Sequence, residues 1–151
     1  MYGLWPSEEI RKNFEKKLKL KPVLEWKTVV ASVKKIKKGE GVGYDLTEKV
    51  ERDSVLALCP IGYWHGFRRA LSGRGEVLIN GKRAKVLGRV SMDMIVVDAT
   101  NVGKVKIGDE VVLIGKQKKG EITAGEMAKI AGTVNYEIVT GINPLIKKFY
   151  K

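Results

Sequence analysis

Short apolar runs separated by turn-forming residues recur along most of this chain. The clearest case has Asn80-Gly81 between the apolar runs 77–79 and 86–87. Both central residues of a type I′ turn need a positive φ, which Asn and Gly tolerate, so this pattern predicts a β-hairpin. The second strand runs into 89–93, a polar and sulfur-containing interruption before the apolar run 94–97. Such an interruption can present groups to a ligand at the rim of a sheet.

Three further segments have the composition of strands. Residues 23–36 alternate and are rich in β-branched side chains, which predicts one long strand. Ser54–Cys59 is a mostly apolar run that Pro60 ends, as expected for a buried strand. Residues 105–115 have the pattern of two strands joined by a tight turn.

A helix is predicted near the N-terminus, where Ser7 can cap the first turn. Acidic residues at its start and lysines at its end match the helix dipole. Its apolar positions recur at helical spacing: Ile10, Phe14 and Leu18. Lys21-Pro22 ends the helix, and we expect its apolar face to pack against another element.

A second short helix is predicted by Thr123 and Glu126, which have the spacing of a capping box, and Gly132 closes it. The tail 134–150 contains only short apolar segments. Many short strands, frequent turns and minor helices together predict a mainly β fold. We therefore expect a compact β-barrel-like domain with a few short helices, including one near the N-terminus.

The composition is that of one globular domain with a strongly basic surface. A chain of 151 residues can bury an adequate core, and 29 Lys and Arg against 17 Asp and Glu give a net charge of +12. This excess fits either a solvated Lys/Glu-rich surface or a polyanionic partner such as nucleic acid. The lysines are spread among acidic residues along the chain, which favours the solvated surface.

Cysteine and histidine usage excludes two kinds of site. One cysteine, Cys59, and one histidine, His65, allow neither a disulfide within the chain nor a zinc-ligand spacing. Cys59 lies in an apolar run and is interpreted as a buried free thiol. No apolar run approaches the roughly 18 residues of a membrane span, and the start of the chain has no signal-peptide pattern, so we expect a cytoplasmic protein.

The residues by themselves do not identify a reaction. Residues 61–69 gather three aromatics, two arginines and the single histidine between glycines, yet no catalytic triad, phosphate-binding loop or carboxylate pair is apparent from spacing. Taken singly, His65 is interpreted as a structural hydrogen-bonding residue. Tyr44 has the position of a packed or rim residue, and Met92 that of ordinary core. What emerges is a basic β-domain with an aromatic, Arg-rich rim.

Six short motifs occur in order and in register along the chain: Met1-Tyr2-Gly3 with Pro6-Ser7, Gly-Glu-Gly-Val-Gly-Tyr at 39–44, Pro-Ile-Gly-Tyr at 60–63, Gly-Arg-Val-Ser-Met-Asp at 88–93, Val-Lys-Ile-Gly-Asp-Glu-Val at 105–111 and Asn-Tyr-Glu-Ile at 135–138. With these motifs the chain resembles the C-terminal domain of alanine racemase, the pyridoxal-phosphate enzyme that interconverts L- and D-alanine. Each motif is short, but together they cover essentially the whole chain.

The resemblance implies an architecture and a set of partners. The full enzyme pairs an N-terminal (β/α)₈ barrel, which carries the cofactor lysine, with this β-domain, and two subunits meet head to tail. Residues 1–22 then correspond to the end of the barrel and a linker helix, and 23–151 to the β-domain. The implied partners are alanine and a second racemase subunit, with neither a membrane nor a nucleic acid expected.

The resemblance also assigns roles to residues. Tyr44 matches the catalytic base that takes the α-proton from L-alanine in the partner subunit's site. A phenol, whose ordinary pKa is about 10, is a weak base, so the chemistry relies on pyridoxal phosphate as electron sink. Arg69 and Arg89 are candidates for favouring the phenolate.

Five more residues match binding or supporting positions. Met92 corresponds to a residue whose backbone N–H binds the substrate carboxylate, and Tyr63 to a tyrosine that narrows access to the site. Tyr136 matches a tyrosine that donates a hydrogen bond to the cofactor phosphate. Ser91 and Asp93 are expected to support this region.

The sequence departs from the family pattern at two positions and in length. His65 stands where the family usually has an acidic residue, and Leu145 where it usually has an arginine, so local ion pairing must differ. A (β/α)₈ barrel takes about 250 residues. The cofactor lysine and most of the phosphate site are therefore expected outside this chain, which we interpret as a fragment, truncated product or split enzyme that is inactive alone.

Several alternatives stay open from the sequence. The chain could instead be a basic β-barrel module that binds nucleic acid or another polyanion, or a folded fragment without activity. A related enzyme acting on serine or another small amino acid is also compatible. An isolated chain should expose apolar residues that normally face the barrel, including Trp5, Ile10 and Phe14, which predicts self-association or a flexible N-terminus.

Overall fold

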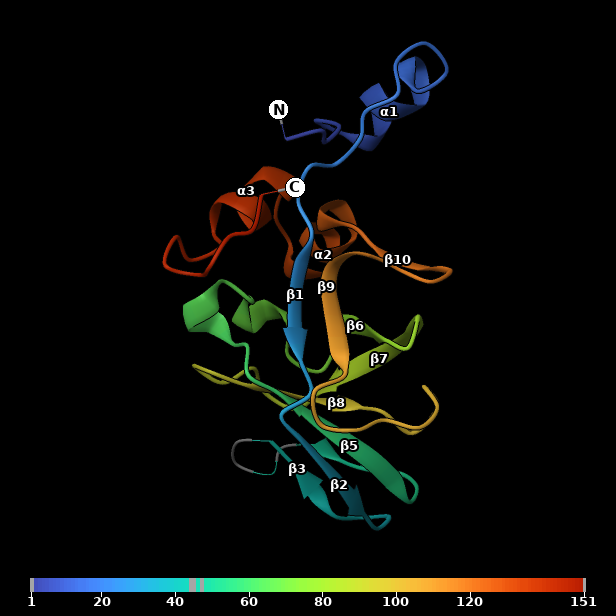
Figure 1. Ribbon diagram of the computed structural model, residues 1–151, viewed down its shortest axis with the longest axis vertical. Coiled ribbons are helices and arrows are strands. Elements are labelled where there is room, and N and C mark those ends of the chain that lie inside the picture. The colour runs from blue at the N-terminus through green and yellow to red at the C-terminus, as the bar shows by residue number, and fades with distance from the viewer. Residues whose placement is uncertain (1, 44–45, 47, 151) are drawn as a thin grey trace.

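The computed structural model describes residues 2–43, 46 and 48–150 and is mainly β with a few short helices, as predicted (Figure 1). Its elements are α1 Glu8–Phe14, β1 Trp26–Val29, β2 Ser32–Ile36, β3 Gly41–Val42, β4 Glu48–Lys49, β5 Ser54–Cys59, η2 Tyr63–His65, η3 Arg69–Leu71, β6 Glu76–Ile79, β7 Lys82–Leu87, β8 Ile95–Asp98, β9 Glu110–Gln117, β10 Gly120–Ile122, α2 Ala124–Ala131 and α3 Asn135–Thr140.

The main sheet has end strands that are consecutive in the chain. Its strands follow the order β1-β9-β6-β7-β8-β5-β2, with β10 paired to β9, and the pairs are antiparallel. β1 and β2 stand at opposite ends of this order, yet only Val30 and Ala31 separate them along the chain. Val30 N–H donates to Asp109 O at 2.9 Å and Ala31 N–H to Leu58 O at 2.8 Å. The sheet is thus barrel-like, although the described strands include no direct β1–β2 pair.

The predicted central hairpin is confirmed. β6 and β7 pair antiparallel with Ile79 opposite Lys82, which leaves a two-residue loop. Asn80 and Gly81 have φ of 55° and 78°, the positive values that a type I′ turn requires. β7 ends at Leu87, so the polar interruption forms a connecting loop before β8.

Two strand predictions are wrong. The stretch 23–36 contains two strands, because β1 pairs with β9 whereas β2 pairs with β5. A change of pairing partner does not alter the alternation of apolar residues, so the sequence pattern could not reveal where one strand ends and the next begins. Residues 105–107 form no strand; Lys106 N–H instead donates to Asp109 Oδ2 at 2.9 Å in a turn that includes Gly108 at φ 89°.

Both predicted helix caps are present. Ser7 Oγ accepts from Ile10 N–H at 3.2 Å, and Thr123 Oγ1 accepts from Glu126 N–H at 3.1 Å. Gly132 ends α2 with φ 72°. α3 begins at Asn135 after the N-cap residue Val134, which provides no side-chain cap, and this helix was not expected.

The N-terminal helix differs from its prediction in length and packing. α1 ends at Phe14, well before Lys21-Pro22, and it extends away from the sheet (Figure 1). Its apolar face does not pack against another element as the spacing predicts, since Ile10, Phe14 and Leu18 are 40%, 51% and 51% exposed; for Ile10 and Phe14 this is the exposure expected of an isolated chain.

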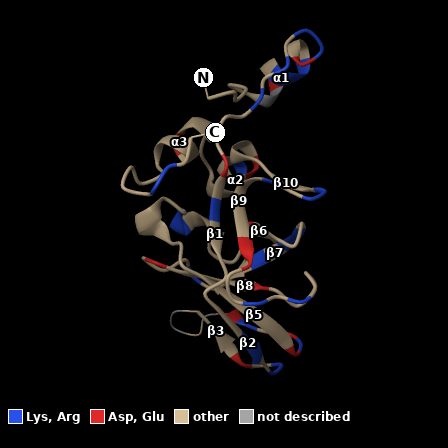
Figure 2. Ribbon diagram, viewed as in Figure 1, with Lys and Arg blue, Asp and Glu red and all other residues tan. Residues whose placement is uncertain are grey.

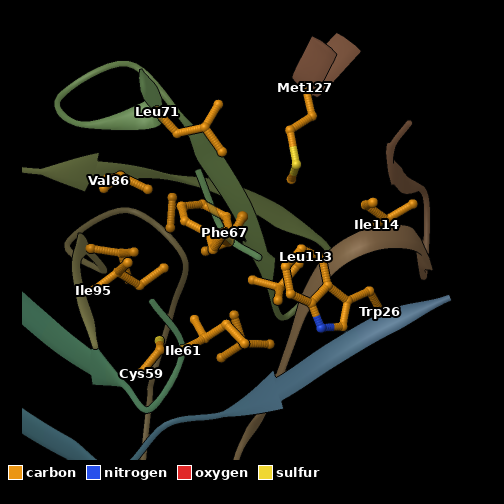
Figure 3. Close-up of a cluster of buried hydrophobic side chains, with 14 of the residues drawn as sticks. Trp26, Cys59, Ile61, Phe67, Leu71, Val86, Ile95, Leu113, Ile114 and Met127 are labelled. Atoms are coloured by element: carbon orange, nitrogen blue, oxygen red, sulfur yellow. The ribbon is translucent and has the colours of Figure 1, made fainter. Parts of the chain in front are cut away.

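One large core lies between the curved sheet and the C-terminal helices. Phe67, with no exposed surface, packs 6.2 Å from Trp26 between ring centroids, and Leu113 and Met127 close the cluster (Figure 3). Cys59 is fully buried in the same core, as predicted, and burial raises the pKa of its thiol to about 12. Within the described residues, no helix is long or apolar enough to cross a membrane.

Candidate functional site

The turn Gly62–Gly66 brings the predicted access residue Tyr63 onto the loop that follows β7. Tyr63 N–H donates to Ser91 O at 3.0 Å, and Trp64 N–H donates to Met92 O at 3.0 Å. A Cβ on Gly62 would collide with both of these carbonyl oxygens, so a glycine is required at this contact. Tyr63 and Met92, each about half exposed, therefore lie on adjoining backbone segments.

A second backbone contact joins the β3–β4 hairpin to the same loop. A Cβ built on Gly43 would lie 3.3 Å from Gly88 Cα and 3.4 Å from Arg89 N, and one on Gly88 would lie 3.0 Å from Val42 O. Both glycines have positive φ, 80° and 64°. Gly43, the last described residue before position 44, thus contacts Gly88-Arg89 through its backbone. Tyr44 itself lies outside the described residues.

Glu48 holds this hairpin in place. Its carboxylate accepts a hydrogen bond from Gly88 N–H, and its Oε1 lies 3.0 Å from Lys85 Nζ. Glu48 belongs to β4, which pairs with β3. Sequence reasoning missed this residue, because nothing in its local pattern distinguishes it from a solvated glutamate.

The loop 88–93 therefore links two contacts. Its first residues touch Gly43, and its last residues accept hydrogen bonds from the Tyr63 turn. Val90 is buried and donates its N–H to Ser72 Oγ at 3.0 Å, which anchors the middle of the loop. Arg89, Met92 and Asp93 are exposed around this anchor.

The backbone of Met92 is free to bind a ligand. Among the described residues, Met92 N–H donates to no acceptor, whereas Ser91 N–H donates to Met94 O at 3.1 Å. An unused amide beside an exposed loop suits recognition of a carboxylate. The arrangement is compatible with the role that the sequence resemblance implies for Met92.

The two adjacent arginines have different environments. Arg68 joins the turn to α3, because its Nη1 lies 2.8 Å from Glu137 Oε1 and its Nη2 donates to Glu137 O at 3.0 Å. Arg69 is exposed and, within the described part of the chain, has no carboxylate partner. Both line a shallow hollow that also includes Tyr63 and Gly141. Arg69 is thus the arginine available to an anionic ligand.

Tyr136 lies against the N-terminal segment. Its hydroxyl donates to Leu4 O over a long 3.4 Å, and the neighbouring Asn135 Nδ2 donates to Trp5 O at 2.7 Å. Asn135 Oδ1 is buried without a partner. The start of α3 thus faces the N-terminal segment. The weakly held hydroxyl of Tyr136 can be redirected to a phosphate oxygen, which fits the expected cofactor contact.

The remaining predicted features are peripheral. Leu145, where the resemblance leads one to expect an arginine, is 79% exposed. No group of three His, Cys, Asp or Glu side chains among the described residues is placed to hold a metal ion. Basic residues are spread from α1 to the β2–β5 end and are interleaved with acidic ones (Figure 2), which favours a solvated surface over one polyanion-binding face.

Comparison with known proteins gives consistent matches. The family model for "Alanine racemase, C-terminal domain" matches residues 23–150. Alanine racemase 1 of Clostridium acetobutylicum is 43% identical over 150 residues, and the alanine racemase of Halothermothrix orenii is 44% identical over 151. These alignments cover 99% and 100% of this chain but 38% and 39% of the relatives.

The solved structures agree. The alanine racemase of Bacillus anthracis with bound L-Ala-P superimposes with a TM-score of 0.87 at 42% identity, covering 94% of this chain and 36% of that one. The chain thus spans less than two fifths of the length of the relatives that it matches. With the sequence match and the shared fold in agreement, the chain belongs to the alanine racemase C-terminal domain family.

Proposed function

We propose that this chain is the C-terminal part of a pyridoxal-phosphate-dependent alanine racemase, with residues 1–22 as the linker from a barrel domain and 23–151 as the β-domain. Tyr44 serves as a catalytic base in the active site of a second, head-to-tail subunit. The chain acts only together with a barrel domain, which carries the cofactor lysine.

The convergence at the loop 88–93 carries this proposal. Three sequence motifs that are far apart in the chain meet there, through the contact of Gly43 with Gly88 and the hydrogen bonds from the Tyr63 turn to Ser91 and Met92. Tyr44 directly follows Gly43 in the sequence. A phenol base together with the unused amide of Met92 suits an amino-acid substrate.

The chemistry divides between this chain and its partner domain. When bound, pyridoxal phosphate supplies the electron sink that makes the α-proton of an amino acid removable. Tyr44 takes that proton at its phenol oxygen, and Arg89 and Arg69, both exposed, favour the phenolate. Met92 N–H binds the substrate carboxylate, and Tyr63 limits access to the site.

The cofactor receives one contact from this chain. Tyr136 donates its hydroxyl to the cofactor phosphate, for which the long bond to Leu4 O leaves it available. Ser91 and Asp93 support the loop that presents Met92. The remaining cofactor contacts belong to the barrel domain.

A chimera tests the proposal directly. The N-terminal part of the Clostridium acetobutylicum relative is joined to this chain, and D-alanine formation from L-alanine is measured with pyridoxal phosphate present. We expect activity that falls by about 10²–10⁴-fold in Tyr44→Phe. Tyr150→Phe, at a 92% exposed tyrosine, is the matched control and should keep full activity.

Two outcomes would contradict the assignment. A folded chimera that is inactive would reject the racemase function, and a Tyr44→Phe variant as active as the control would reject the role of Tyr44. L-Serine, assayed in parallel, determines whether the substrate preference extends beyond alanine.

A further inference from the structure

His65 closes the turn that carries Tyr63. Its Nδ1 accepts a hydrogen bond from Gly62 N–H at 3.1 Å, and the backbone N–H of His65 donates to Gly62 O at 3.0 Å. The imidazole thus satisfies the amide at the start of η2 while the backbone bond closes the same turn. Because Nδ1 is the acceptor, this nitrogen carries no proton in the bonded form.

The same turn is also hydrogen-bonded to two other segments. The backbone N–H groups of Tyr63 and Trp64 donate to the carbonyls of Ser91 and Met92. In addition, Asn143 N–H donates to His65 O at 3.1 Å. Any change in the Gly62–His65 bond therefore reaches both Tyr63 and the Met92 backbone.

Protonation of the ring would break this bond. An imidazolium has a proton on each nitrogen and cannot accept from Gly62 N–H. The charged residues on the segments bonded to the turn are Arg89 and Asp93 in the loop 88–93, Arg68 and Arg69 after the turn, and Glu137 in α3. In the described part of the chain neither carboxylate forms an ion pair with the imidazole, and Glu137 is already paired with Arg68. The Trp64 ring lies edge-on to the imidazole at 4.9 Å and offers no charge.

We propose that neutral His65 is a positioning residue for the racemase site, and that its protonation releases the Gly62–Gly66 turn. Release disorders Tyr63 and the Met92 backbone together, so substrate binding weakens as the ring takes up a proton. The activity part of this inference rests on the proposed function, whereas the coupling between ring and turn does not.

The coupling is tested first on the chain itself by NMR. The ring C–H signals of His65 and the amide signal of Gly62 are followed from about pH 8 to pH 5, where histidine changes charge. We expect the Gly62 amide to move with the same midpoint as the ring, and the amides of Tyr63 and Trp64 to follow. A Gly62 amide that stays unchanged through the ring titration overturns the proposal.

The chimera then tests the consequence for catalysis. His65→Asn retains an acceptor near the Nδ1 position but does not titrate, and His65→Asp provides a second acceptor that stays ionised in this range. We expect KM for L-alanine in the unmodified chimera to rise roughly tenfold when nine tenths of the ring is protonated, because only the neutral fraction binds well. Both variants should lack this rise.

The outcomes separate the two proposals. An inactive chimera with intact ring-to-amide coupling rejects the racemase function and leaves the turn mechanism supported. If KM rises equally at acidic pH in the unmodified chimera and in a folded His65→Asn or His65→Asp variant, the positioning role of His65 is rejected.

Discussion

Gly43 and Gly88 pack backbone against backbone, with a Cβ on Gly88 placed only 3.2 Å from Gly43 Cα. This contact sets the position of the segment that leads into Tyr44 relative to the loop that contains Met92. It exists because both residues lack a side chain and both adopt a positive φ. Two glycines that are far apart in the sequence thus define one part of the site.

Gly88→Ala is expected to destabilise the chain by about 2–4 kcal/mol, since the methyl group adds a steric contact to the strain of φ 64°. The matched control is Gly103→Ala, which has φ 92° but no atom within 4 Å of the added Cβ and should cost only about 1 kcal/mol. Urea unfolding measures both. Equal losses in the two variants would show that the Gly43–Gly88 contact does not constrain the fold.

Glu48→Gln tests the anchor of the β3–β4 hairpin. The amide loses the charged interactions with Gly88 N–H and Lys85, so we expect a loss of about 1–2 kcal/mol in stability and lower kcat in the chimera. Glu51→Gln, at an exposed glutamate for which no ion pair is found in the described structure, is the control. Unchanged kcat in Glu48→Gln would argue against a role for this anchor.

Cys59 should be unreactive in the folded chain and should affect stability only in alkali. Its pKa is raised to about 12 by burial, whereas an unfolded thiol ionises near the ordinary value of 9.0. The unfolded state alone then loses the proton between pH 9 and 12, so stability falls as pH rises through this window. Chemical denaturation of the unmodified chain and of Cys59→Ala at several pH values measures the difference.

A thiol reagent provides the second readout for this cysteine. Labelling by Ellman's reagent near neutral pH should be at least ~10³-fold slower in the native chain than in denaturant, since it requires opening of the core. Rapid native labelling would mean that Cys59 is not buried in solution.

The apolar face of α1 should cause the isolated chain to self-associate. Ile10 and Phe14 on α1, and Leu18 just beyond its end, are all substantially exposed in a segment that extends from the domain. Ile10→Ser with Phe14→Ser is expected to weaken association roughly tenfold, as measured by light scattering over a concentration series. Leu145→Ser, at a more exposed leucine outside this face, should leave association unchanged. A monomeric unmodified chain would refute the prediction.

The sequence motifs predicted candidate site residues, but not how these residues assemble. Two of the predicted residues, Tyr63 and Met92, lie on segments that the structure brings together through the hydrogen bonds of the Tyr63 turn to 91–92. The roles of Glu48 and Arg68 were missed, because each depends on a partner distant in the chain. The hydrogen bond from Gly62 N–H to His65 Nδ1 could not be predicted for a different reason, because the sequence pattern does not define the turn in which it forms.

The sequence by itself determined the features that depend on a few neighbouring residues. Asn80-Gly81 specifies a hairpin turn through its tolerance of positive φ, and Ser7 and Thr123 specify helix starts through their own hydroxyl groups. Only the tertiary structure decided where the stretch 23–36 breaks, because Val30 and Ala31 bond to different distant segments. The same holds for the contact of Gly43 with Gly88. Local conformational preferences are encoded within a turn or two of chain, whereas the choice of a distant partner depends on how the whole sheet curves.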